Sequence, residues 1–234
     1  MTMATRFIEN KSQDCLRTKA AKVALTQILE TLTPNSVIGI GTGATVEVFV
    51  QLLAESNVKF SHCVSSSERS SKALEGAGLI TRPIAESSSL DFYVDGIDEG
   101  LSNGVTVKGG GAALAREKVL ATQASTFITI ADDGRLVETL GTFPLPIEIL
   151  PAAKSSVVHT LEVMGGSPKE REGCVTDNGN IILDVSGLTM TDPKQLELCI
   201  NSIPGVVENG IFAYRSADLM VFSNTEGSYC LFEK

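Results

Sequence analysis

The chain has 234 residues, of which 43% are hydrophobic, and its 28 acidic and 19 basic residues give a net charge of −9. This length suits one large domain, alone or with a smaller one. The apolar content excludes a disordered chain, and the negative charge disfavours nucleic acid and anionic membranes as partners. One small anion remains compatible with this charge, because backbone amides and a single lysine can bind it locally.

The few cysteines and histidines limit the possible chemistry further. The five cysteines are odd in number and show no C-x-x-C spacing, which predicts reduced thiols and a cytoplasmic location. His62 and His159 are too few for a zinc site or a histidine-based catalytic cluster. Residues 1–15 lack the apolar stretch of a secretory leader, and no apolar run reaches membrane-spanning length.

The first part of the chain alternates between expected helices and strands. Pro34 ends the first helix, and Ser65 with Glu68 forms a capping box at the start of a later one. The series is a helix at 13–32, a strand at 36–41, a helix at 44–56, a strand at 60–65, a helix at 65–78, strands at 79–83 and 90–95, a helix at 112–123 and a strand at 126–132. This alternation predicts an α/β fold, with a Rossmann-like parallel sheet and helices on both of its faces.

The pattern changes after Arg135. The turn sequence DNGN at 177–180 predicts a hairpin. The expected elements are a strand at 143–151, a helix at 152–165, strands at 173–176 and 181–185, a helix at 192–201 and a strand at 205–210. Their β-α-β-β-α-β order predicts a smaller α+β domain of the ferredoxin-like kind at 136–209. The last strands, near 218–223 and 229–232, are expected to return to the large domain, which takes residues 1–135 and 210–234.

The first glycine-rich stretch, GIGTGA at 39–44, follows a strand and opens a helix. It matches the dinucleotide fingerprint G-x-G-x-x-G/A, but no acidic residue stands at 60–67 to bind a ribose hydroxyl. An NADP site would need Ser66, Ser67 and Arg69 instead. A tight turn without a ligand is a further alternative. The position at the carboxyl end of the first strand favours a phosphate site made of backbone amides and threonine hydroxyls.

Three carboxylates, Asp95, Asp98 and Glu99, follow the strand at 90–95. Carboxylates that lie close together raise one another's pKa, which suits groups that exchange protons near neutral pH. The same oxygens could bind Mg²⁺, and an acidic turn in contact with solvent is the third interpretation.

Lys108 precedes three glycines and a predicted helix that carries Glu117 in its second turn. Consecutive glycines let the backbone approach a ligand closely. Small and apolar neighbours of Glu117 would desolvate its carboxylate and raise its pKa into the range of a general base. An exposed carboxylate paired with a lysine is the alternative for Glu117. Together, an anion site, a lysine and a carboxylate base favour removal of a proton next to the carbonyl of a phosphorylated sugar.

Seven segments resemble, in order, the motifs of ribose-5-phosphate isomerase type A. They are GIGTGAT, VSSSERSS, LDFYVDGIDE, VKGGGAALAREK, FPLPIEILP, VTDNGNIILDV and IPGVVENGIFA. The resemblance extends over nearly the whole chain from about residue 14, and the DGIDE and KGGGAALAREK pair is specific to that family. It implies interconversion of D-ribose 5-phosphate and D-ribulose 5-phosphate in the non-oxidative pentose phosphate pathway, with no metal or organic cofactor.

The resemblance also implies roles for individual residues. Glu117 would move the proton between C1 and C2 through an enediolate, and Lys108 would stabilise the negative oxygen. Asp95 and Asp98 would help to open the sugar ring and hold its hydroxyls. The implied substrate-binding residues are Lys19, Thr42, Gly43, Ala44, Thr45, Asp95, Gly96, Ile97, Asp98, Lys108, Gly109, Gly110, Gly111 and Arg135. Family members are commonly homodimers or homotetramers, so we expect one of these states.

This sequence departs from the family pattern at three positions. Ala44 stands where the family often has serine, which removes a hydroxyl but keeps the amide. Ile97 replaces a more usual alanine, and we expect its side chain to point into the core. Arg135 stands where the family usually has a lysine, which keeps the charge but changes its shape.

Two other classes of protein would share parts of this pattern. A sugar-phosphate-binding regulator would have the anion site but would also need a DNA-binding segment, which the acidic composition disfavours. An NADP-dependent reductase would use the glycine loop differently, and a spectroscopic titration with NADPH distinguishes it.

Overall fold

The computed structural model describes the backbone of residues 3–233 and the side chains of residues 14–231. Two predictions fall partly outside these residues. They are the absence of a secretory leader at 1–15 and the two ends of the large domain, 1–135 and 210–234. The chain forms two compact units. The first contains the residues up to Gly96, then Gln123–Arg135 and the residues from Asp218 onward, and the second contains Ile97–Thr122 and Leu136–Ala217. No helix within residues 3–233 combines the length and the apolar character needed to cross a membrane.

The first unit is built around one sheet, with strands in the order β13-β12-β6-β3-β1-β2. All neighbouring strands are parallel except β12 and β13. The strands are β1 Val37–Ile40, β2 His62–Ser65, β3 Leu90–Asp95, β6 Ala124–Asp132, β12 Leu219–Ser223 and β13 Ser228–Glu233. The helices are α1 Met3–Leu29, α2 Ala44–Glu55, α3 Glu68–Gly76 and the 3-10 turns η1 Ile84–Glu86 and η2 Asp133–Arg135.

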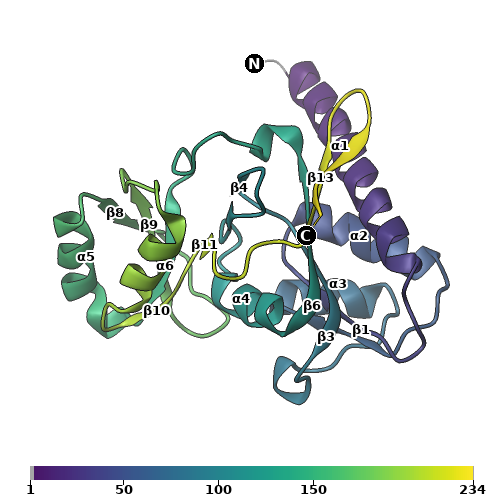
Figure 1. The fold of residues 1–234 in the computed structure, drawn as a ribbon, viewed down its shortest axis with the longest axis horizontal. Coiled ribbons are helices and arrows are strands. Elements are labelled where there is room, and N and C mark those ends of the chain that lie inside the picture. The colour runs from purple at the N-terminus through teal and green to yellow at the C-terminus, as the bar shows by residue number, and fades with distance from the viewer. Residues whose placement is uncertain (1–2, 234) are drawn as a thin grey trace. The chain divides into compact units, whose positions relative to one another are not determined.

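Helix α1 packs against α2 and against strands β6 and β12 (Figure 1). The contact buries apolar residues of both helices, including Ala24, Ile28 and Phe49, against Ile38 and Ile128 of the sheet. Each of these five side chains is at most 1% exposed, which accounts for the near-continuous apolar runs of the parallel strands.

The strand order places a topological switch point between β1 and β3. Strand β2 lies on one side of β1, and the chain then crosses to β3 on its other side. In open α/β sheets, ligands bind outside the carboxyl ends of the strands at such a point. The turn after Ile40 and the carboxylate of Asp95 lie at this edge, because both follow directly from these two strands.

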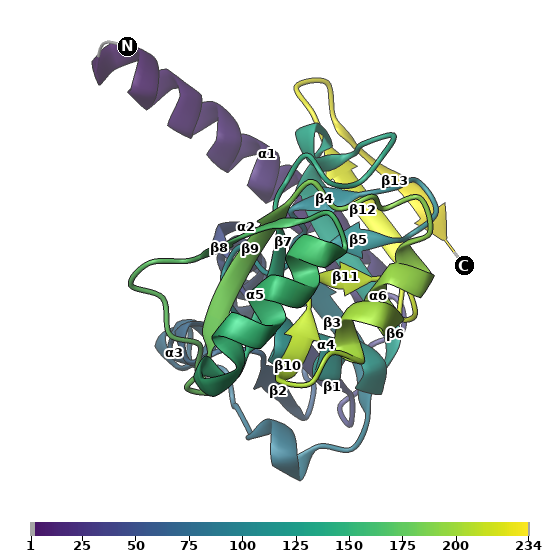
Figure 2. The same cartoon turned by 90° about the vertical axis from the view of Figure 1, so that its left-hand side faces the viewer.

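The second unit contains a four-stranded antiparallel sheet in the order β10-β7-β9-β8. Helices α5 and α6 lie on the same side of it (Figure 2), where Leu161 and Ile200 join its apolar core. A small sheet in the order β11-β5-β4 belongs to the same unit. The elements are β4 Glu99–Gly100, β5 Thr106–Val107, α4 Leu114–Gln123, β7 Leu145–Ile149, η3 Pro151–Ala153, α5 Lys154–Val163, β8 Ser167–Glu170, β9 Ile181–Ser186, α6 Pro193–Asn201, β10 Val206–Asn209 and β11 Ile211–Phe212.

The predicted α/β class and the β-α-β-β-α-β order of the smaller module are confirmed. The compact units, however, do not follow the predicted domain limits. Residues 97–122 and 210–217 belong to the second unit, although the sequence placed them in the large domain. The physical reason is the pairing of β5 with both β4 and β11, which ties these segments together across about a hundred residues of chain.

Several predicted element limits were wrong. The first helix begins at Met3 rather than residue 13. Helix α3 is capped by Ser67, whose hydroxyl accepts from the Ser70 amide, and not by Ser65. Residues 79–83 form no named strand and are joined to β2 only by an isolated bridge at Thr81. In the smaller module, β9 pairs with 167–170 and not with the predicted 173–176, so the turn that joins them is longer than DNGN.

Candidate active site

The turn after β1 is shaped by a buried carboxylate. Asp95 is completely buried, and its Oδ1 accepts hydrogen bonds from the amides of Thr42 at 3.0 Å and Gly96 at 2.7 Å. The hydroxyl of Tyr93 donates to its Oδ2. A Cβ at Gly41 would lie 1.9 Å from the Asp95 carboxyl carbon, so only glycine fits there. The structure therefore brings Thr42 and Asp95 together at the ends of β1 and β3.

Hydroxyl groups hold the same turn from its other side. The Oγ1 of Thr42 lies 2.8 Å from the hydroxyl oxygens of both Ser66 and Ser67, and Ser70 donates to the carbonyl of Gly41 at 2.6 Å. Ser66 and Ser67, considered above for an NADP phosphate, thus support the turn. Arg69, the third residue of that hypothesis, pairs with Glu47 at 2.6 Å.

Helix α2 begins at Ala44, directly after this turn. Gly43 adopts φ 137° and has no side chain to cap the helix. The first amides of a helix have no carbonyl partner within the helix and carry partial positive charge. Thr45 adds a hydroxyl in the first turn, and residues 42–45 are half-buried. The arrangement is able to bind a phosphate through amides, and serine is not needed at position 44.

Two basic residues that were predicted to bind the substrate, Arg135 and Lys19, also belong to the first unit. Arg135 belongs to η2, which follows β6, so its backbone lies at the same sheet edge as Asp95. The ammonium of Lys19 donates to the carbonyls of Asn224 and Thr225, each at 3.1 Å. Among the described side chains, no bond joins Lys19 to residues 42–45, and its visible function is to tie α1 to the turn before β13.

In the second unit, Lys108 and Glu117 form a buried ion pair. The Lys108 Nζ lies 3.2 Å from the Glu117 Oε2, and the residues are 3% and 2% exposed. Lys108 leaves β5 with its amide bonded to the Gly210 carbonyl at 2.8 Å, and Glu117 lies in the first turn of α4. The exposed position considered for Glu117 is therefore wrong. Burial of both groups strengthens their interaction and keeps bulk water away from the carboxylate.

A second lysine, Lys118, lies next to Glu117 in the sequence and is half-buried. Lys118 donates to Glu197 at 2.9 Å and to Glu208 at 2.8 Å, and also to the carbonyls of Asn209 and Ile211. The ring centroid of Phe212 lies 4.9 Å from the Lys118 ammonium and 5.5 Å from that of Lys108. An aromatic face attracts nearby cations, so the ring of Phe212 contributes a favourable contact to both ammonium groups. No motif marks Lys118 in the sequence, where its only signal is its place next to Glu117.

Residues 97–99 come before this ion pair along the chain. Asp98 accepts a hydrogen bond from the Gly110 amide at 2.7 Å. Ile97 is buried, as expected. Glu99 is also buried, and its carboxylate accepts from the backbone amides of Gly141 and Phe143. Glu99 therefore organises a loop and is not part of a carboxylate cluster. Among the described residues, no group of three His, Cys, Asp or Glu side chains is arranged to hold a metal ion.

Comparison with known proteins identifies the family. The model of ribose 5-phosphate isomerase A (phosphoriboisomerase A) matches residues 62–227. The chain belongs to the ribose 5-phosphate isomerase A family. Its activity is accordingly that of an aldose–ketose isomerase acting on ribose 5-phosphate.

Solved isomerase structures agree with this assignment over nearly the whole chain. The ribose 5-phosphate isomerase A of Neisseria gonorrhoeae is 39% identical, with 95% of this chain and 98% of that chain covered and a TM-score of 0.90. That of Methanocaldococcus jannaschii is 32% identical, with 94% and 99% covered and a TM-score of 0.86. A D-ribose-5-phosphate isomerase solved in complex with phospho-erythronic acid is 33% identical, with 95% and 99% covered and a TM-score of 0.87.

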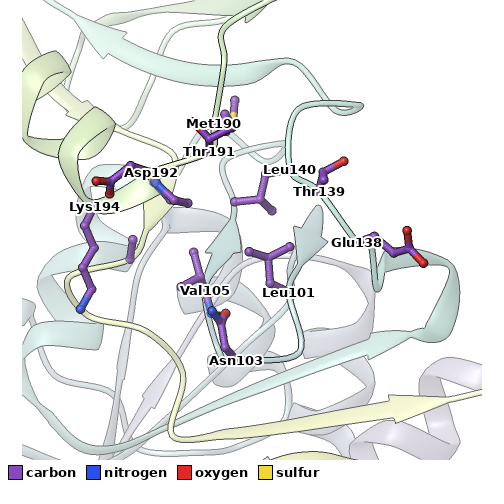
Figure 3. Close-up of a pocket in the computed structure, with 12 residues that line it drawn as sticks. Leu101, Asn103, Val105, Glu138, Thr139, Leu140, Met190, Thr191, Asp192 and Lys194 are labelled. Carbon is purple, nitrogen blue, oxygen red and sulfur yellow. The ribbon is translucent and has the colours of Figure 1, made fainter.

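The second unit of the isomerase also contains a pocket that no sequence motif indicates. Its volume is about 520 Å³. Leu101, Val105 and Leu140 form an apolar part, and the polar side chains of Glu138 and Lys194 lie at its rim (Figure 3). None of the residues predicted for the substrate lines it.

His62 and Cys63 of the first unit, which lie outside the predicted site, have shifted pKa values. Burial lowers the pKa of His62, with a further contribution from the positive charge of Arg82. Burial raises the pKa of the Cys63 thiol to about 12. A neutral imidazole and a neutral thiol at physiological pH agree with structural roles for both residues.

Proposed function

We propose that Glu117 is the base of the isomerase and that Lys108 stabilises the charge that develops on the substrate. In this proposal the Glu117 carboxylate removes the proton from C2 of D-ribose 5-phosphate and returns it to C1. The intermediate is an enediolate, and the product is D-ribulose 5-phosphate. The observation that carries the proposal is the buried pair of Lys108 and Glu117, with 3.2 Å between ammonium and carboxylate.

The geometry of this pair suits both tasks. A neighbouring ammonium favours the ionised carboxylate, which is the form that a base requires. As the proton moves to Glu117, the carboxylate loses its charge while an oxygen of the substrate gains one. The Lys108 ammonium is then attracted to the substrate oxygen, so its stabilising interaction grows in the transition state, where it accelerates the reaction.

The phosphate of the substrate, in this proposal, binds to the amides of Gly43, Ala44 and Thr45 with the hydroxyls of Thr42 and Thr45. The free amides of the α2 N-terminus support this assignment. The remaining contacts follow from the resemblance. Asp95 and Asp98 help ring opening and hold hydroxyls. The backbone at Gly96, Ile97, Gly109, Gly110 and Gly111 and the side chains of Arg135 and Lys19 complete the predicted set.

The activity is tested by incubating purified, chelator-treated protein with D-ribose 5-phosphate and measuring the ketose formed. We expect D-ribulose 5-phosphate to accumulate to the equilibrium ratio without added metal or cofactor. A protein that forms no ketose while fully folded would overturn the proposal.

A competition experiment with a substrate analogue tests where the substrate binds. The related isomerase solved with phospho-erythronic acid suggests this compound as a probe, because its carboxylate resembles the charge distribution of an enediolate. We expect competitive inhibition with a dissociation constant below the KM. The Glu117→Gln variant should still bind the probe. A variant in which the anion site at the N-terminus of α2 is disrupted should bind the probe more weakly.

We also propose that the isomerase is cytoplasmic and forms a homodimer or homotetramer, with neither nucleic acid nor membrane as a partner. The family resemblance supports the oligomer, and the free cysteines and the net charge of −9 support the rest. Light scattering after size-exclusion chromatography distinguishes the two states from the monomer mass of 24.7 kDa.

A further inference from the structure

The loop after Lys108 has unusual backbone freedom. Gly109 adopts φ 111° and Ala112 φ 58°, both in the left-handed region, with two more glycines between them. A peptide group between two glycines rotates with little steric hindrance, because neither residue carries a Cβ. Such a peptide needs other contacts if it is to keep a single orientation.

One peptide group of this loop is held at both of its ends. The carbonyl of Gly109 accepts a hydrogen bond from the Nη1 of Arg171 at 3.0 Å. The N–H of Gly110, in the same peptide group, donates to the Oδ2 of Asp98 at 2.7 Å. The same Nη1 also reaches the carbonyl of Gly110 at 3.1 Å. A flip of the peptide between Gly109 and Gly110 would therefore break contacts with two charged side chains.

Arg171 is itself rigidly placed. Its Nε and Nη2 donate to the two oxygens of Asp184 at 2.9 and 2.5 Å, and its amide continues the ladder of β8 with β9 by bonding to Ile182. The hydrogen bond with Asp184 raises the pKa of the guanidinium, and the charge of Asp98 raises it further. A planar guanidinium has enough N–H donors to bond Asp184 and the loop carbonyls at the same time. A lysine ammonium has fewer donors and cannot form the paired hydrogen bonds with a carboxylate.

We propose that Arg171 is a positioning residue of the isomerase, which locks the Gly109–Gly110 peptide and thereby fixes Asp98 and Lys108. The proposal rests on the function assigned above to these two residues. Asp98 is held through the locked amide, and Lys108 precedes the locked peptide by one residue. Arg171 has no assigned contact with substrate and acts through the loop.

The test compares Arg171→Met with the wild type in the isomerase assay. Removal of the lock lets the glycine peptide rotate and misplaces the Lys108 ammonium, so kcat should fall by about 10- to 100-fold. KM should change much less, because the phosphate contacts lie in the other unit. Arg171→Lys should recover only part of the loss. Methylguanidinium added to Arg171→Ala should restore kcat in a saturable manner, which a general loss of stability would not permit.

The matched control is Lys154→Met, which removes an exposed ion pair with Glu170, the residue before Arg171, at 2.5 Å. It should leave kcat unchanged. Asp184→Asn provides a second variant if Arg171→Met does not fold, and it should lower kcat by a smaller factor. An active wild type together with a kcat within about twofold in Arg171→Met would overturn the proposal. A wild type without isomerase activity would instead overturn the proposed function.

Discussion

The two glycine turns of this chain, one in each compact unit, are held by different kinds of contact. The turn at Gly41 is supported by a buried carboxylate and by neutral serine hydroxyls. The loop at Gly109 is held by charged side chains, Asp98 and Arg171, and is preceded by a buried ammonium.

We propose that the two turns have different tasks in catalysis. Neutral hydroxyls and helix amides bind a permanent anion without a change in protonation, which determines affinity. A buried ammonium and carboxylate respond to charge that appears only during the reaction, which determines rate. Substitutions in the second unit should therefore act mainly on kcat, and substitutions at the first turn mainly on KM.

The largest expected effect follows Glu117→Gln. The change removes the base with little change in volume, so kcat should fall by at least about 10²-fold while KM stays near its original value. Steady-state kinetics with ribose 5-phosphate measures both constants. Glu170→Gln, at a half-buried carboxylate of the same unit that pairs with Lys154, is the control. Near-normal turnover in Glu117→Gln would exclude this residue as the base.

A slightly smaller effect is expected from Lys108→Met. Loss of a preset cation should lower kcat by about 10²- to 10³-fold, since the interaction strengthens in the transition state. The same kinetic assay checks this, with Lys154→Met as the matched control. An effect confined to KM would show instead that Lys108 binds the ground state only.

The first turn is probed by Thr42→Val, which removes a hydroxyl and keeps the shape. Loss of one hydrogen bond to a charged group should raise KM roughly tenfold and leave kcat nearly unchanged. Thr26→Val, at a hydroxyl exposed on α1, is the control. If kcat fell in Thr42→Val and KM did not change, the assignment of separate tasks to the two turns would be wrong.

The smallest effect concerns stability and not activity. The Cys63 thiol has a pKa raised from 9.0 to about 12, so its contribution to stability is complete below pH 9. That contribution is lost as pH rises from 9 toward 12, because the unfolded thiol ionises first. Urea unfolding at pH 8 and pH 10 should show a decrease that is smaller in Cys63→Ala by about 1.4 kcal/mol. An identical decrease in both proteins would contradict the buried thiol.

The sequence predicts those parts of the site that follow from strand order. Asp95 and Thr42 end neighbouring parallel strands, so their meeting at one sheet edge could be expected from the alternation of elements. The contacts of Lys118 and Arg171 could not be predicted, because the partners lie far away in the sequence. Lys118 contacts residues from Glu197 to Ile211, and Arg171 contacts Gly109 and Gly110, which are separations of 61 to 93 residues. Glu99 was misinterpreted for a similar reason, since its amide partners come from a loop that has no motif of its own.

The most direct test of the account follows solvent deuterium in the substrate. Wild-type protein and Glu117→Gln are incubated with ribose 5-phosphate in D₂O over many turnovers and followed by NMR. Transfer of the proton through a carboxylate predicts that deuterium enters C2 of the aldose and C1 of the ketose, and that both rates fall together in Glu117→Gln. Isomerisation or deuterium exchange at the wild-type rate in Glu117→Gln would contradict it.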